Sequence, residues 1–244
     1  MIGKLWTTVV VSVGLVLGAS ALAGAEPGAG GFTFSPPPGW IDISRGAPEA
    51  QRQKAPPALL AQADNPGMAF VAFDPASGDD SFIENVNAVV ETGPQPVITP
   101  QNLAELQKAL EGELGKQGLA YRPLKMAVVK IQGVTAGRLV GELKVPNGVV
   151  NLVQFAIPVK GSRATLTFTT TPDKLAHYEP IFDAAAQATL GAVEPSGTSS
   201  IKDSAVRGAI IGGIAGGIGA LIAAMVKRRR RAAAAARPPA SGTG

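Results

Sequence analysis

Apolar and polar positions alternate along much of the chain, and this period of two predicts strands. "FTFS" and "WIDIS" flank the turn "PPPG", so they predict a short hairpin at the start of the folded region. Residues 68–73, "MAFVAF", predict a buried strand. Residues 81–91, "SFIENVNAVVE", predict another strand, although their composition would also suit a helix.

A leucine repeat at helical spacing predicts the main helix. Thr99 and Pro100 supply an N-cap and a first-turn proline, and Gly118 ends the segment. The side chains that share one face, and that we expect to pack on a sheet, are Leu103, Leu106, Leu110 and Leu114. Residues 45–66 are rich in Pro, Ala and Gln, so they predict a long surface loop with one helical turn near Leu59.

Residues 124–170 predict an antiparallel meander. Asn147-Gly148 suits a type I′ hairpin turn between two of its strands. "RATLTFTT" alternates, and it directs Ala164, Leu166 and Phe168 toward the core and Thr165, Thr167 and Thr169 away from it. The whole order of elements predicts an α+β domain with one mainly antiparallel sheet covered by helices.

A second helical region is expected after the meander, where Thr171-Pro172 opens it. Its inward side chains are predicted to be Leu175, Tyr178, Ile181, Phe182 and Leu190. Pro180 lacks a backbone N–H, so we expect it to split this region into a turn and a helix.

The N-terminal segment has the pattern of a secretory signal peptide, residues 1–25. Lys4 precedes an apolar stretch over residues 5–22, and Ala23 and Ala25 stand at −3 and −1 of a cleavage site. The alternative is an uncleaved first transmembrane helix, since the apolar stretch is nearly long enough to span. Residues 26–31 form a Gly/Pro spacer before the extracytoplasmic domain, residues 32–193.

The segment Gly208–Val226 carries no charged residue, and at about 1.5 Å per residue it just crosses a hydrocarbon core about 30 Å thick. A polar stalk, residues 194–207, precedes it. The stop-transfer residues that follow are Lys227, Arg228, Arg229, Arg230 and Arg231. Positive residues stay in the cytoplasm, so residues 227–244 are expected to be a cytoplasmic tail and the domain to lie outside the cytoplasm of a single-pass cell-membrane protein. The alternative, a Gly-rich linker, is disfavoured by the many isoleucines of the segment.

Small residues recur every four positions in this predicted transmembrane helix, at Gly208, Gly212, Gly216, Ala220 and Ala224. Close approach along such a ridge holds membrane helices together, which raises the hypothesis of a homo-oligomer. Small residues are also common in membrane helices that do not associate, and this alternative stays open.

The formal net charge of +4 is misleading, because the charges are unevenly placed. Between residues 26 and 206 the chain has 14 Lys plus Arg against 18 Asp plus Glu, a net charge of −4. Nucleic-acid binding needs a positive surface matched to phosphates, so nucleic acid is not an expected partner.

Candidate chemistry is sparse. His177 is the only histidine and there is no cysteine, so we expect neither a metal site nor another cofactor. A Ser-His-Asp arrangement would need His177, for which a surface or capping role with Asp173 nearby is favoured. Asp79-Asp80 supplies too few oxygens for calcium, and Glu111 and Glu113 do not share a helix face. We therefore do not expect an enzyme.

Trp40 and the loop of residues 45–66 are the remaining candidates for partner contact, because exposed aromatics and loops often carry recognition. The alternative for Trp40, packing into the core, is the favoured one, since large aromatic side chains are usually buried.

Three segments resemble a known group of proteins: "FSPPPGWIDIS", "FIENVNAVVE" and "PVKGSRATLTFTTTPDKLAHYEPIFDAAAQATL". They are similar to the fold shared by PsbP, the bacterial DcrB-like proteins and a Ran-binding nuclear import factor. The resemblance covers residues 32–190 and rests on element order and turn motifs. It implies a binding or assembly role, and no site residue can be carried over.

Two functions follow as expectations. The first is a membrane-anchored extracytoplasmic interaction or adaptor domain for a protein or envelope component. The second is a small-ligand carrier or stress sensor that binds an apolar molecule between the sheet and the helices. A pocket lined by apolar side chains would favour the carrier, whereas a filled core and an apolar surface patch would favour protein binding.

Overall fold

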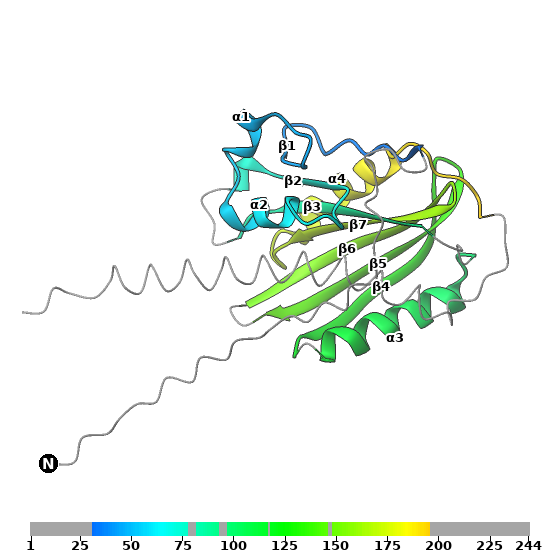
Figure 1. Cartoon of the computed structure of the whole chain (residues 1–244). Coiled ribbons are helices and arrows are strands. Elements are labelled where there is room, and N and C mark those ends of the chain that lie inside the picture. Colours follow the sequence, from blue (N-terminus) through cyan, green and yellow to red (C-terminus); the bar gives the residue numbers. More distant parts are fainter. Residues whose placement is uncertain (1–30, 78–81, 93–96, 117, 146–147, 196–244) are drawn as a thin grey trace, which may run out of the picture.

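The computed structural model describes residues 31–77, 82–92, 97–116, 118–145 and 148–195 (Figure 1). The predicted signal peptide, transmembrane helix and basic tail lie outside these ranges. Among the described residues, no helix combines the length and apolar composition needed to cross a membrane.

The domain is built on one seven-stranded sheet in which every neighbouring pair is antiparallel (Figure 1). The strand order is β1-β2-β3-β7-β6-β5-β4. The strands are β1 (Ile41–Asp42), β2 (Phe70–Phe73), β3 (Asn85–Thr92), β4 (Ala120–Ile131), β5 (Val134–Val145), β6 (Gly148–Val159) and β7 (Ser162–Thr170). The predicted α+β class with an antiparallel sheet is therefore confirmed.

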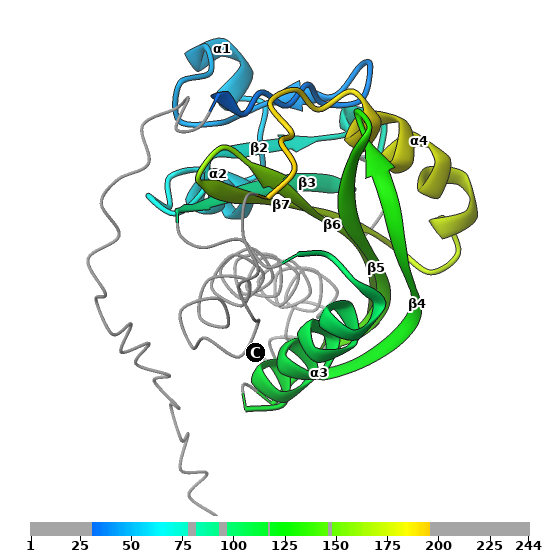
Figure 2. The ribbon, with the colours of Figure 1, turned by 90° about the vertical axis from the view of Figure 1, so that its right-hand side faces the viewer.

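Helices cover both faces of this sheet. They are α1 (Glu49–Arg52), α2 (Pro57–Ala63), α3 (Pro100–Lys116) and α4 (Leu175–Gln187), with a 3-10 turn, η2 (Pro75–Ser77). The sheet curves, with α3 inside the curve and α4 outside it (Figure 2). We call the side that packs against α2 and α3 the inner face and the side that packs against α4 the outer face.

The main helix forms as predicted, because its cap and its leucine face both find partners. The Thr99 hydroxyl accepts a hydrogen bond from the backbone N–H of Asn102 at 3.1 Å, which caps α3. All four predicted leucines are buried in the inner core. Glycine at position 137 gives the Leu103 side chain room to lie directly on β5, since a Cβ there would clash with it.

The outer face has its own apolar core under α4. The rings of Phe168 and Phe182 stack with centroids 4.6 Å apart. At the rim, the largely buried Arg138 donates hydrogen bonds of 2.8 Å to Asp183 and to Glu179. This pairing ties α4 to β5.

The expected hairpin between "FTFS" and "WIDIS" is wrong. Thr33 forms an isolated bridge with Leu190, and β1 pairs with β2 instead. The prolines of "PPPG" cannot donate ladder hydrogen bonds, and the Phe34 ring packs edge-on against Phe70 with centroids 5.0 Å apart. The two halves of the predicted hairpin therefore go to different partners.

Two further expectations are corrected. Residues 45–66 contain two short helices rather than one turn: α2 includes the helical turn predicted near Leu59, whose side chain is buried with Ala63 against β2, and α1 was not predicted and has no buried residue. Pro180 lies inside α4 without splitting it. Pro180 removes only one backbone hydrogen bond of α4, just beyond its first turn. Its ring lies on the exposed side of the helix, and the buried Phe182 holds the other side of the helix against the core.

Candidate functional site

A group of polar side chains lies on the inner face of the sheet, across the three neighbouring strands β3, β7 and β6. We call it the polar band. Its members are Asn87, Glu91, Gln154, Arg163, Thr165 and Thr167. The register brings them together, because Asn87 and Gln154 both lie opposite Thr167, from β3 and β6 respectively.

The rest of the band follows from the period of two. Val89 lies opposite Thr165, and Glu91 lies opposite Arg163, further along the same two strands. Side chains two residues apart on a strand point to the same face, so the band continues along β3 and β7. Its neighbour on β6 is the small Ala156, opposite Thr165.

The threonines of β7 alternate with apolar residues as the sequence predicted, but they are not at a solvent face. Thr165 and Thr167 are only 6 % and 2 % exposed. Arg163 is 4 % exposed and Asn87 3 %. Because core packs on both faces of this sheet, a polar position in a central strand here is an interior position.

Only part of the band is paired internally. The Gln154 side-chain amide donates a hydrogen bond of 3.1 Å to the Thr167 hydroxyl, and Arg163 donates to the Glu91 carboxylate. Within the part of the chain that the structure describes, four buried atoms of the band have no partner: Asn87 Oδ1, Glu91 Oε1, Arg163 Nε and Thr165 Oγ1. Buried polar atoms are normally hydrogen-bonded, so four open atoms within one face call for an explanation.

Burial raises the pKa of Glu91, while the charge of Arg163 and its hydrogen bond lower it by less. The Glu91 carboxylate therefore gives up part of its preference for the charged state. The positive charge of Arg163 balances the negative charge of the Glu91 carboxylate, so the polar band as a whole carries no net charge.

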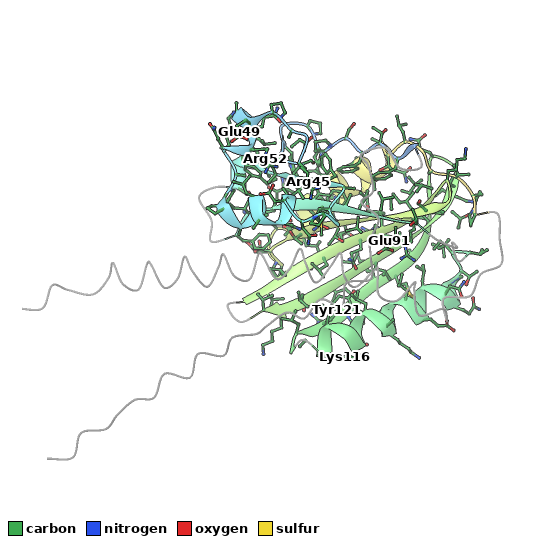
Figure 3. All side chains as sticks on the ribbon, in the orientation of Figure 1. Arg45, Glu49, Arg52, Glu91, Lys116 and Tyr121 are labelled. Carbon is green, nitrogen blue, oxygen red and sulfur yellow. The ribbon has the colours of Figure 1, made fainter. Side chains whose placement is uncertain are left out.

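Helices flank the band on either side. Most contacts of α2 fall on β2 and most of those of α3 on β4, at opposite sides of the inner face (Figure 2). Figure 3 shows Glu91 within the sheet, with Tyr121 and Lys116 toward the α3 side and Arg52 toward the α1 and α2 side. The α2 side chain of Gln62 is 2 % exposed, and neither polar atom of its amide has a partner.

The chemistry of these groups is that of hydrogen bonding. The band offers amides, hydroxyls and one neutralised ion pair. Across the described ranges, no group of three or more His, Asp or Glu side chains is placed to hold a metal ion.

Trp40 is partly buried, in agreement with the core interpretation. Its ring meets Tyr178 and Phe182 edge-on, with centroids 6.3 and 6.1 Å apart. Tyr178 in turn donates a hydrogen bond of 2.6 Å to Asp74. These contacts fasten the start of the domain to α4.

The other residues singled out from the sequence are not brought together. His177 and Asp173 are both exposed, and His177 lies edge-on against Tyr178. Glu111 is exposed on α3. Asp79-Asp80, the small-residue ridge from Gly208 to Ala224 and the basic run from Lys227 lie outside the described residues.

A second feature is the free edge of the sheet. Among the described strands β4 pairs only with β5, and three apolar side chains at alternate positions of β4 are exposed: Leu124 (37 %), Met126 (38 %) and Val128 (39 %). We call these three the edge row. Sequence reasoning placed this segment in the meander but could not show that it ends the sheet.

A third feature is a shallow apolar hollow of about 590 Å³. Residues 35–38 form one wall, and the other comes from Pro180, Ile181, Ala184, Ala185 and Ala188. It lies outside the core, between the proline turn and α4. Its walls are mostly proline and alanine, so it offers shape but few hydrogen bonds.

The comparisons with known proteins concern the fold. No family model matches the chain, and no curated protein matches it. Among solved structures, it is similar to cyanobacterial PsbP from Synechocystis, with 17 % identity, 66 % of this chain and 86 % of that chain covered, and a TM-score of 0.46. It is also similar to LpqN, a Mycobacterium tuberculosis protein described as involved in cell envelope biogenesis, with 17 % identity, 65 % and 81 % covered, and a TM-score of 0.39.

A protein of unknown function from Pseudomonas aeruginosa is similar at 21 % identity, with 48 % and 78 % covered and a TM-score of 0.39. PsbP, the group that the sequence motifs resemble, is thus also among the structures similar to this chain.

Proposed function

We propose that this chain is a single-pass membrane protein whose α+β domain lies outside the cytoplasm and acts, without catalysis, as an interaction domain for another protein. The anchor and the orientation rest on the sequence alone, on the uncharged segment Gly208–Val226 and the basic residues after it. The observation that supports protein binding is the edge row on the unpaired strand β4.

An unpaired edge offers backbone N–H and C=O groups to an added strand, and apolar side chains beside them add affinity. Only part of β4 is open in this way. Pro123 lies at a register shift, and the Nζ atoms of Lys125 and Lys130 lie 3.2 and 3.4 Å from Glu179 and Glu194. The partner that fits is a short extended protein segment with apolar side chains, laid along residues 126–129, where Met126 and Val128 are the members of the edge row beyond the register shift.

The test uses the full chain in detergent. The double variant Met126→Lys and Val128→Lys places charges along the edge, and Val149→Lys is the matched control, since Val149 is 38 % exposed on β6. Proteins cross-linked to the wild type and to the control, but lost from the edge variant, support the proposal. Equal recovery from all three chains would remove the edge as the binding surface.

The orientation has its own test. Protease added from outside to cells with an opened envelope should digest the domain and leave an epitope after Arg231 intact. Digestion of that epitope with protection of the domain would reverse the proposed topology.

The anchor is also proposed to pair with a second copy through its small-residue ridge. Gly212→Leu with Gly216→Leu should abolish cross-linked dimers of the full chain in membranes. Dimers that persist unchanged would exclude this face as the contact.

The second candidate function is a small-ligand carrier, and the polar band favours it. The sequence led us to expect an apolar ligand, but the centre of the inner face carries four buried polar atoms without partners. A ligand placed there would need polar groups of its own.

A further inference from the structure

We propose that the polar band binds an uncharged ligand through neighbouring hydroxyl groups; this inference rests on the carrier function rather than on the protein-binding one. The band lies in the interior of the domain. Arg163, Asn87 and Thr165 are each more than nine-tenths buried, and each has one polar atom without a partner.

The charges select the ligand class. Glu91 and Arg163 neutralise each other, with side chains only 10 % and 5 % exposed. A charged ligand would have to leave water without finding a free opposite charge, and that is strongly unfavourable in an interior. The band therefore suits a neutral ligand.

The open hydrogen-bonding atoms point to hydroxyl groups. Asn87 Oδ1 and Glu91 Oε1 accept hydrogen bonds, Arg163 Nε donates one, and the Thr165 hydroxyl does either. A hydroxyl group also both donates and accepts, so two adjacent hydroxyls can serve neighbouring positions of the band, such as those of Thr165 and Arg163. Asn87 and Glu91 lie four residues apart on β3, about 13 Å along the strand, so a ligand that reaches all four atoms needs hydroxyls spread along its length. Val89 and Ala156, opposite Thr165 on the two neighbouring strands, offer apolar contact to the carbon skeleton.

The experiment measures the binding of three small probes to the full chain in a polyoxyethylene detergent, which contains no sugar. The probes are glucose, which is neutral, glucose 6-phosphate, which is anionic, and glucosamine, which is cationic. We expect saturable binding of glucose, with at least tenfold weaker binding of the two charged analogues. Tighter binding of either charged probe would overturn the proposal.

Variants locate the binding. Thr165→Val should weaken glucose binding about fivefold, the effect of about one hydrogen bond, and Thr165→Ser should restore it. Thr169→Val is the control, because its hydroxyl lies on the same strand and face but already donates to the Asn85 carbonyl at 3.5 Å. A similar loss in both valine variants would contradict a site at the polar band.

Mass analysis of material released when the purified chain is denatured distinguishes the source of the ligand. A free polyol and a polyol headgroup on a larger envelope molecule would each support the proposal, and they differ in the attached mass. If glucose does not bind and no uncharged hydroxyl compound is released, the proposal is wrong. The cross-linking of a protein at β4 would be unaffected, so failure here is separable from failure of the interaction function.

Discussion

Arg163 of β7 lies directly opposite Glu91 of β3, and its guanidinium donates a hydrogen bond to the Glu91 carboxylate inside the domain. The two residues are 72 positions apart in the chain. An ion pair at this depth has a desolvation cost that the mutual attraction roughly offsets, so its net contribution to stability is small.

Removing one member of this pair should therefore cost much more than removing both. We expect Arg163→Leu to lower the free energy of unfolding by about 3–5 kcal/mol, because it leaves a buried carboxylate uncompensated. The double variant Glu91→Leu with Arg163→Leu should lie within about 1 kcal/mol of the wild type or above it. Urea unfolding followed by circular dichroism measures both, and equal losses in the two variants would contradict this account.

Acid should reveal the raised pKa of Glu91. Its folded-state pKa lies above the ordinary value of 4.5, so the folded protein takes up this proton before the unfolded chain does. Glu91 therefore lowers stability at neutral pH, and this loss is recovered as the pH falls through the raised pKa. Stability measured against pH should show the wild type gaining relative to Glu91→Gln as the pH approaches 4.5; a constant difference would show that the carboxylate is not perturbed.

The unpartnered hydroxyl of Thr165 should lower the stability of the protein without ligand. Thr165→Val keeps the shape and removes an unpartnered buried polar atom, so it should raise the free energy of unfolding by about 1 kcal/mol. Thr167→Val is the opposite case, since it strands the Gln154 amide that donates to it, and it should cost about 1–3 kcal/mol. The midpoint of thermal unfolding should therefore rise in Thr165→Val and fall in Thr167→Val, relative to the wild type.

Alkaline pH should destabilise the domain through Tyr121. Burial, and to a smaller extent the charge of Glu111, raises the pKa of Tyr121 from 10.0 to about 12. Between these values the unfolded chain loses a proton that the folded protein keeps, so stability falls as the pH rises. In an absorbance titration, one phenol that ionises near pH 12 in the wild type should be missing from Tyr121→Phe. If both tyrosines of the wild type ionise together near pH 10, Tyr121 is not buried as the structure has it.

Two glycines should respond oppositely to alanine. A Cβ at Gly141 would strike the Tyr121 ring, so Gly141→Ala should cost about 1–3 kcal/mol by overpacking. Gly112 lies within α3 with open space around it, so Gly112→Ala should add up to about 1 kcal/mol from helix propensity. The midpoint of guanidinium unfolding should fall in Gly141→Ala and rise in Gly112→Ala.

Local patterns predicted the parts of the fold that depend on local physics. The leucines of α3, the cap at Thr99 and the meander strands follow from periodicity and turn chemistry, and they are confirmed. The partner of Thr33 and the extent of helix between residues 45 and 66 were mispredicted, because distant residues, Leu190 and the strand β2, contribute to them.

The polar band could not be predicted for a similar reason. The alternation of "RATLTFTT" identified the two faces of β7 correctly, but no pattern within one strand says what covers each face. Only the register with β3 and β6 places Asn87 and Gln154 beside Thr167. A clue in the sequence was that the apolar strand "NVNAVVE" carries Asn at two alternate positions, Asn85 and Asn87.

The chain leaves the described domain beside the β4–β5 turn, where the Glu194 carboxylate accepts hydrogen bonds from the Thr135 backbone N–H and hydroxyl, both at 2.9 Å. In the proposed topology, residues 196–207 form the tether from this point to the membrane, a reach of at most about 40 Å when fully extended. Lys130, at the end of the free strand β4, lies next to the same point. In that topology a partner bound to β4 would be held within reach of the bilayer, and a pulling force on the tether would act on the Glu194 contacts first.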